Sequence, residues 1–64
     1  MKNRALLLCL KNNIEFIEEY AFRIGVSMDT VRGILDETII IPDDIVKRNC
    51  ELFGVSKEYF LCLI

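Results

Sequence analysis

Few side chains in this sequence are suited to catalysis or to metal binding. The chain of 64 residues contains no histidine, and its three cysteines, Cys9, Cys50 and Cys62, form no CxxC pair. A structural zinc site needs about four nitrogen or sulfur ligands, and catalysis needs acids, bases or nucleophiles gathered in one cleft. The sequence therefore predicts a protein that is not an enzyme and binds no metal or cofactor. Its cysteines are expected to be reduced, buried thiols in a cytoplasmic protein.

The segment RIGVSMDTVRGI, residues 23–34, has the spacing of two helices joined by a tight turn. Gly25 can end the first helix in a left-handed conformation. A small residue, Ala21, lies four positions before it. Ser27 can then cap the second helix. Apolar residues that would hold the pair together recur at Ile24, Val26, Val31 and Ile34. This pattern predicts a helix-turn-helix.

The outer face of the second helix carries the candidate contacts to DNA bases, which are Met28, Asp29, Arg32 and Gly33. Arg32 has a donor fork that matches a base edge, although an arginine solvated on a helix surface is an equally simple interpretation. Asp29 either stabilises the positive end of the helix or accepts a hydrogen bond from cytosine, and it repels phosphate in both cases. Gly33 would allow DNA or a protein to approach closely, or is simply tolerated.

Composition predicts one small domain spanning residues 1–64. A chain this short buries only about 60% of its unfolded surface, so it must be rich in apolar residues, and 53% of its residues are hydrophobic. Such a density leaves apolar surface exposed, which favours a protein–protein contact. Eight basic and ten acidic residues give a net charge of −2. The sequence therefore lacks the basic excess that is typical of nucleic-acid binding.

Helical periodicity runs through almost the whole chain and predicts an all-α fold of five helices. The first helix covers residues 2–11, and it is too short for a membrane span. Asn12 and Glu15 form a possible capping box for the second helix, whose apolar stripe is Ile14, Ile17, Ala21 and Ile24. Pro42 suits the first position of a fourth helix that ends at Gly54. A fifth helix follows Ser56 and runs to residue 64.

The chain resembles the Cro/C1-type (XRE-like) helix-turn-helix family over nearly its whole length. The matching features are Tyr20-Ala21, the turn Gly25-Val26-Ser27, Pro42, the second turn Gly54-Val55-Ser56, and Tyr59-Phe60-Leu61. The resemblance implies a compact five-helix, lambda-repressor-like domain. It also implies a homodimeric transcriptional regulator that places its third helix in the major groove of double-stranded DNA.

The sequence departs from the family pattern on the side expected to face DNA. The family usually has a glutamine at the start of the second helix, where this chain has Ile17, and polar or basic residues on the third helix, where this chain adds Asp36 and Glu37. Basic side chains elsewhere remain available for the DNA backbone. The candidate phosphate contacts are Lys2, Arg4, Lys11, Arg23 and Ser27.

Two further segments are candidates for a protein interface. Residues 38–41, TIII, read as an extended connection, in which Ile39 and Ile41 point to one side and Ile40 to the other. In the last helix Tyr59, Phe60 and Leu63 can face the core. The candidate interface residues are Ile39, Ile40, Ile41, Leu61, Cys62 and Ile64. These exposed apolar groups predict a homodimer joined through the last helix.

Two functions therefore remain open from the sequence. One is a DNA-binding regulator acting as a homodimer, which the spacing of the two helices favours. The other is a helix-turn-helix domain that serves as a protein interaction module and binds little or no DNA, which the acidic residues of the third helix favour.

Overall fold

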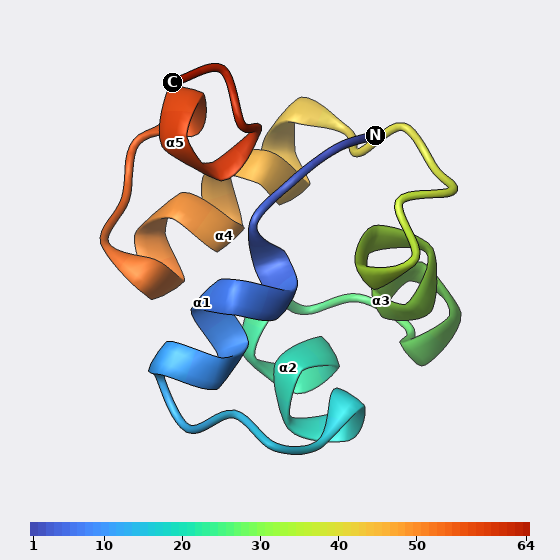
Figure 1. Cartoon of the computed structure of the whole chain (residues 1–64). Helices are drawn as coiled ribbons and strands as arrows, with labels where there is room; N and C mark the ends of the chain where they lie inside the picture. Colours follow the sequence, from blue (N-terminus) through green and yellow to red (C-terminus); the bar gives the residue numbers. More distant parts are fainter.

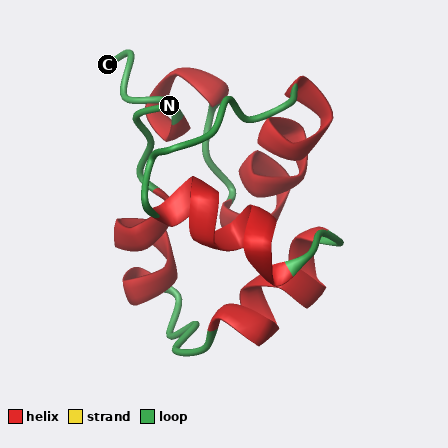
Figure 2. Cartoon of the chain, turned by 90° about the vertical axis from the view of Figure 1, so that its right-hand side faces the viewer, coloured by secondary structure: helices red, strands yellow, loops and turns green.

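The order of the helices follows the turn and capping signals of the chain. The computed structural model describes residues 1–64. It contains α1 (Ala5–Lys11), α2 (Ile17–Ile24), α3 (Met28–Leu35), α4 (Asp43–Phe53) and α5 (Lys57–Phe60). Figure 1 labels these helices, and Figure 2 shows only helices and loops, with no strand. The prediction of an all-α fold with five helices is therefore confirmed. None of these helices has the length and apolar character needed to cross a membrane.

One apolar core joins all five helices. α2 packs against both α3 and α4, while α1 contacts α3 and α5 contacts α4. Thirteen apolar residues are buried in this core, and the largest of them are Tyr20, Phe60, Ile24, Ile34 and Val31. The loops contribute Ile14 and Ile41.

A buried polar pair ties α2 to α4 within the core. The Tyr20 hydroxyl donates a hydrogen bond to Oδ1 of Asn49, which is fully buried. Nδ2 of Asn49 donates in turn to the carbonyl oxygen of Ile45 at 2.9 Å. No buried side-chain nitrogen or oxygen lacks a hydrogen-bond partner. The amide of Asn49 is therefore accommodated in the core without an unpaired polar group.

Both Gly-Val-Ser turns have the predicted conformation. Gly25 ends α2 with φ of 71°, and Gly54 ends α4 with φ of 67°, a region that glycine occupies without steric cost. Ser27 caps α3 by accepting from the Thr30 amide at 3.2 Å, and Ser56 caps α5 by accepting from the Tyr59 amide at 3.1 Å. Each turn therefore ends one helix and starts the next.

The first helix begins later than predicted, at Ala5 and not at residue 2. The Asn3 side chain is the reason, because its Oδ1 accepts from the Ala5 amide at 2.9 Å and its Nδ2 donates to the Ile34 carbonyl at 2.9 Å. The Asn3 amide donates to Oε2 of Glu37 at 2.9 Å. These contacts hold the N-terminal segment in an irregular conformation against the end of α3.

The predicted capping box of Asn12 and Glu15 is wrong. Nδ2 of Asn12 donates to the Leu8 carbonyl at 2.7 Å, so this side chain completes the end of α1. Asn13 then takes φ of 58°, and Phe16 is the extended residue before α2. Pro42 likewise precedes α4 and is not its first residue, because the helix begins at Asp43.

The last helix ends at Phe60 and does not run to residue 64. Cys62 adopts φ of 61°, and the Leu63 amide donates to the Glu58 carbonyl at 2.8 Å, a pattern that closes a helix. Phe60 fills the core as expected, but Leu63 is exposed, which contradicts its predicted inward position. The turn at Cys62 directs residues 63–64 away from the core.

Arg4 joins the N-terminal segment to this C-terminal turn. Its amide donates to the Phe60 carbonyl at 2.8 Å. The guanidinium lies over the Tyr59 ring, 4.2 Å from the centroid, and donates to the carbonyl oxygens of Tyr59 and Ile64. The segment around residue 4 is therefore held beside the C-terminal turn.

Candidate functional site

The outer face of α3 is the first candidate site, and the tight turn before it determines which side chains point outward. Val31 and Ile34 are fully buried, so they fix the inner face of α3 against the core. Met28, Asp29 and Arg32 are exposed on the opposite side. Three of the four predicted base contacts are therefore exposed on α3, the helix at the right of Figure 1.

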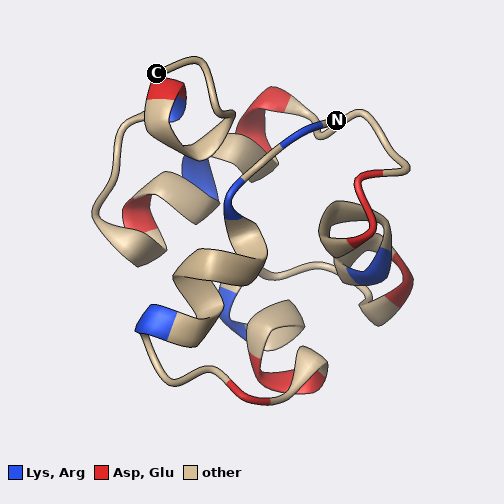
Figure 3. Cartoon of the chain, in the orientation of Figure 1, with Lys and Arg blue, Asp and Glu red and all other residues tan.

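The charge of this surface is mainly negative. Nη1 of Arg32 lies 3.2 Å from Oδ1 of Asp29, so its donor fork already has an internal partner. Asp36 and Glu37 are exposed at the other end of the helix. Figure 3 shows one cationic position on α3 among these acids. Phosphate would therefore meet more repulsion than attraction on this face.

Gly33, the fourth predicted base contact, is not on this face. It is buried, and a Cβ built at this position would lie 2.8 Å from Cγ2 of Ile39. The missing side chain lets the connection after α3 pack directly on the helix. Gly33 is thus a packing residue, and its predicted role as a DNA contact is contradicted by its burial.

The candidate phosphate contacts are dispersed, and several are engaged elsewhere. Arg4 is held at the C-terminal turn, and Arg23 lies 3.4 Å from Oε2 of Glu19. Lys2 and Lys11 are exposed and make no ion pair within the chain, but Lys11 lies at the end of α1, across the molecule from α3 (Figure 3). The Ser27 hydroxyl serves as the cap of α3.

Arg48 is a cation beside the turn that the sequence pattern did not indicate. Its Nη1 donates to the carbonyls of Ile24 and Gly25 at 3.2 and 3.3 Å, and Nη2 lies 3.7 Å from Oδ2 of Asp44. Arg48 therefore supplies donors to carbonyl groups at the C-terminal end of α2 and holds the turn against α4. The contact joins residues 24 positions apart, so no local pattern could reveal it.

The predicted interface residues do not form one surface. Ile41 is buried in the core and Ile39 covers Gly33, so neither is available to a partner. Ile40 is 83% exposed and points away from both, as the alternation predicts. Leu61 and Cys62 are half-buried, and Ile64 is 74% exposed. Figure 1 places this C-terminal segment and the connection before α4 on opposite sides of the molecule.

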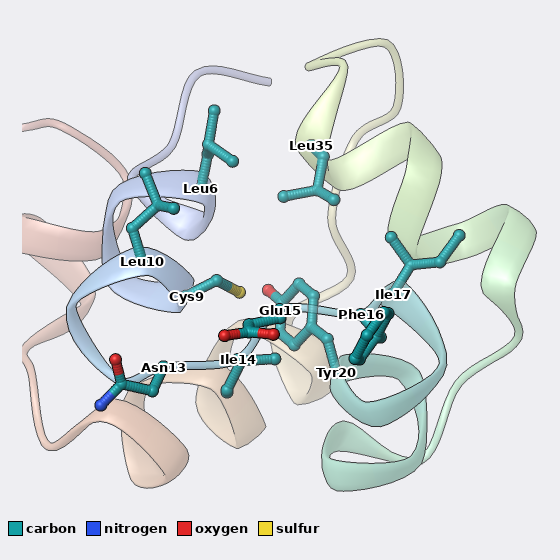
Figure 4. Close-up of a pocket in the computed structure, with 10 residues that line it drawn as sticks. All are labelled: Leu6, Cys9, Leu10, Asn13, Ile14, Glu15, Phe16, Ile17, Tyr20 and Leu35. Atoms are coloured by element: carbon teal, nitrogen blue, oxygen red, sulfur yellow. The ribbon is translucent and has the colours of Figure 1, made fainter.

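The main exposed apolar surface is instead a groove beside α1, which sequence reasoning missed. The groove has a volume of about 440 Å³ and opens between α1 on one side and α2 and α3 on the other (Figure 4). The residues that line it are Leu6, Cys9, Leu10, Asn13, Ile14, Glu15, Phe16, Ile17, Tyr20 and Leu35. The segment ALLLCL is apolar on every side of a helix, which is the signal that could have predicted exposed leucines here.

The thiol in this groove is not a nucleophile. Burial raises the pKa of Cys9 from 9.0 to about 11, and the nearby Glu19 carboxylate adds to this. Burial also raises the pKa of Cys50. A thiol reacts as the thiolate, so both shifts lower the reactivity of these groups near neutral pH. The structure gathers no group of three histidine, cysteine or carboxylate side chains that could hold a metal ion.

No model of a known protein family, no curated protein and no solved structure matches this chain. Its function must therefore be argued from its own residues.

Proposed function

We propose that this chain is a small helix-turn-helix regulator that binds double-stranded DNA as a homodimer through α3. The observation that carries the proposal is the arrangement of α2, the Gly25 turn and α3. α3 is capped by Ser27 and anchored by Val31 and Ile34, while its outer face meets no other part of the chain. A helix presented in this way can enter the major groove, as helix-turn-helix domains do.

The three exposed side chains can discriminate bases. An arginine fork matches O6 and N7 of guanine, a carboxylate can accept from N4 of cytosine, and an apolar group packs on the thymine methyl. Arg32, Asp29 and Met28 supply these three groups. The Arg32–Asp29 pair is solvent-exposed, so it contributes only about 0–1 kcal/mol and can be exchanged for contacts to bases.

The backbone contacts are expected to be few, because the free cations lie far apart. Each neutralised phosphate changes the slope of log affinity against log salt by about −0.9. With at most about four phosphate contacts per subunit, the salt dependence should be shallow and the affinity modest.

The test is enrichment of bound duplexes from a random pool, followed by titration of the enriched duplex at ~50 and ~200 mM salt. Wild-type protein should bind it better than a scrambled duplex. Arg32→Ala should remove this preference, whereas the matched variant Arg23→Ala, on α2, should keep it. Absence of binding at ~50 mM salt would overturn the proposal.

A second candidate function is a protein interaction module built on the same helix pair. The acidic excess of α3 favours it, because Asp29, Asp36 and Glu37 outnumber Arg32 on a surface that would face a polyanion. The same titration separates the two functions. A folded protein that fails to retain duplex at low salt fits the interaction module alone.

A further inference from the structure

The groove between α1 and α2 is a hollow with an unusually apolar rim for so small a molecule. Leu6, Leu10 and Phe16 stand at its edges with 59%, 68% and 64% of their surface exposed. Leu6 and Leu10 are one helical turn apart on α1, and Phe16 faces them from the loop before α2 (Figure 4). An exposed patch of this kind on a soluble domain marks a contact surface.

This surface contains both halves of a self-complementary interface. Leu10 and Phe16 project from the rim, while Cys9, Ile14 and Tyr20 lie at the base of the hollow. A two-fold symmetric interface uses the same patch on both subunits, so each patch must provide projections as well as a cavity. The groove meets this requirement within one short stretch of chain.

The charges around the groove are also complementary to those of a second copy of the chain. Lys11 ends α1 on one side, and Glu15 lines the groove on the other. Neither makes an ion pair within the chain, so both are free to pair with a charge of another molecule. A two-fold axis between these positions would place Lys11 of one copy beside Glu15 of the other, at two symmetric points.

We infer that the groove beside α1 is the docking site of a second copy of this chain. Leu10 and Phe16 of each subunit enter the hollow of the other, and two Lys11–Glu15 pairs close its rim. This contact is the interface of the homodimer in the proposed function, and it rests on that proposal only for the dimeric state. The outer face of α3 contributes nothing to the groove lining, so this dimer leaves it open.

The C-terminal segment offers less to such an interface. Its two exposed apolar residues, Leu63 and Ile64, surround no hollow, and the groove described above is the only pocket of the structure. The whole chain exposes 4152 Å², and a stable interface takes about 800 Å² from each partner. A dimer centred on the groove would therefore cover about a fifth of the surface of each chain.

The first experiment is sedimentation equilibrium of the wild type and of Leu10→Lys, without DNA. Leu10→Lys should weaken dimerisation by about tenfold or more, because an ammonium group would enter an apolar cavity. The matched controls are Phe22→Lys and Ile64→Lys, which make the same change at exposed residues outside the groove. Both should dimerise like the wild type. Circular dichroism of each variant verifies that its helices are intact.

The second experiment tests the charge pairing with two complementary variants. Lys11→Glu and Glu15→Lys should each dimerise about tenfold more weakly alone, because each homodimer then contains two like-charge contacts. An equimolar mixture should recover the wild-type association. In the mixed dimer one contact joins the two introduced charges, which are opposite, and the other joins the two native ones. Changes within a single chain cannot produce this recovery.

A wild type that stays monomeric up to about 1 mM would overturn the inference, since a surface built for association should act below that range. Equal weakening by Leu10→Lys and Ile64→Lys, or a mixture that recovers nothing, would overturn it as well. Because no DNA is present, failure here is distinct from failure of the proposed DNA binding.

Discussion

Gly33 of α3 packs directly against Ile39 in the connection that follows the helix. A Cβ at position 33 would lie 2.8 Å from Cγ2 and 3.1 Å from Cγ1 of Ile39. Isoleucine is branched at Cβ and has restricted side-chain rotation, so it cannot turn aside freely. The absence of a side chain at Gly33 is therefore required by the packing, although glycine is unfavourable within a helix.

Gly33→Ala should lower the free energy of unfolding by about 1–2 kcal/mol. Overpacking costs about 1–3 kcal/mol, and the better helix propensity of alanine returns up to about 1 kcal/mol. Urea denaturation measures the difference. In an Ile39→Ala background the clash is gone, so the same change should raise the free energy of unfolding by up to about 1 kcal/mol. A similar loss in both backgrounds would contradict this account of Gly33.

At the scale of the helices, the two capping serines form a matched pair. Ser27 caps α3 and Ser56 caps α5, at 3.2 and 3.1 Å from the amides they accept. Ser27→Ala and Ser56→Ala should each lower the free energy of unfolding by about 0.5–2 kcal/mol. Only Ser27→Ala should also weaken the proposed DNA binding, because α3 carries the proposed base contacts. Thermal denaturation and duplex titration check the two effects separately.

The elements that sequence could predict are those fixed by local chemistry. The left-handed glycines Gly25 and Gly54 and the two capping serines act within a few residues, and all four appear where expected. Asn12 was misassigned because its side chain can cap a following helix or complete the preceding one. The Ile14 amide donates to the Cys9 carbonyl at 2.9 Å, as expected where Asn12 completes the preceding helix.

The candidate site was predictable in part for the same reason. Periodicity places Met28, Asp29 and Arg32 on one face of α3, but it cannot show that Ile39 folds back over Gly33. Arg4 is predicted as a phosphate contact and is instead bound to the C-terminal turn. Contacts of this kind depend on which distant segments meet. The spacing of residues along one helix cannot predict them.

At the scale of the whole molecule, two thiols and a tyrosine hydroxyl make the free energy of unfolding depend on pH in the alkaline range. The Cys9 pKa is raised by burial from 9.0 to about 11, and burial raises the pKa values of Cys50 and Tyr20 as well. Above pH 9 the unfolded chain loses the Cys9 proton while the folded chain retains it. The stability contributed by the neutral thiol is thus complete below pH 9 and is lost as the pH rises through about 11.

Cys9 alone should therefore lower the free energy of unfolding by about 2–3 kcal/mol between these pH values, as two pKa units imply, and Cys50 and Tyr20 should add to the decline. Urea denaturation at a series of pH values measures the decline. Cys9→Ala should reduce the decline to the part that Cys50 and Tyr20 contribute. An unchanged slope in Cys9→Ala would show that another group is responsible.

The contacts between Arg4 and residues 59–64 set the order in which the chain can fold during synthesis. Arg4 needs the carbonyls of Tyr59, Phe60 and Ile64, which the ribosome adds long after it. At about 5–20 residues per second, Arg4 waits several seconds for them. During that time Leu6 and Leu10, on the same helix, have no finished core beside them. The newborn chain is therefore a candidate client of chaperones that hold apolar segments, until residues 59–64 have left the ribosome and bind Arg4.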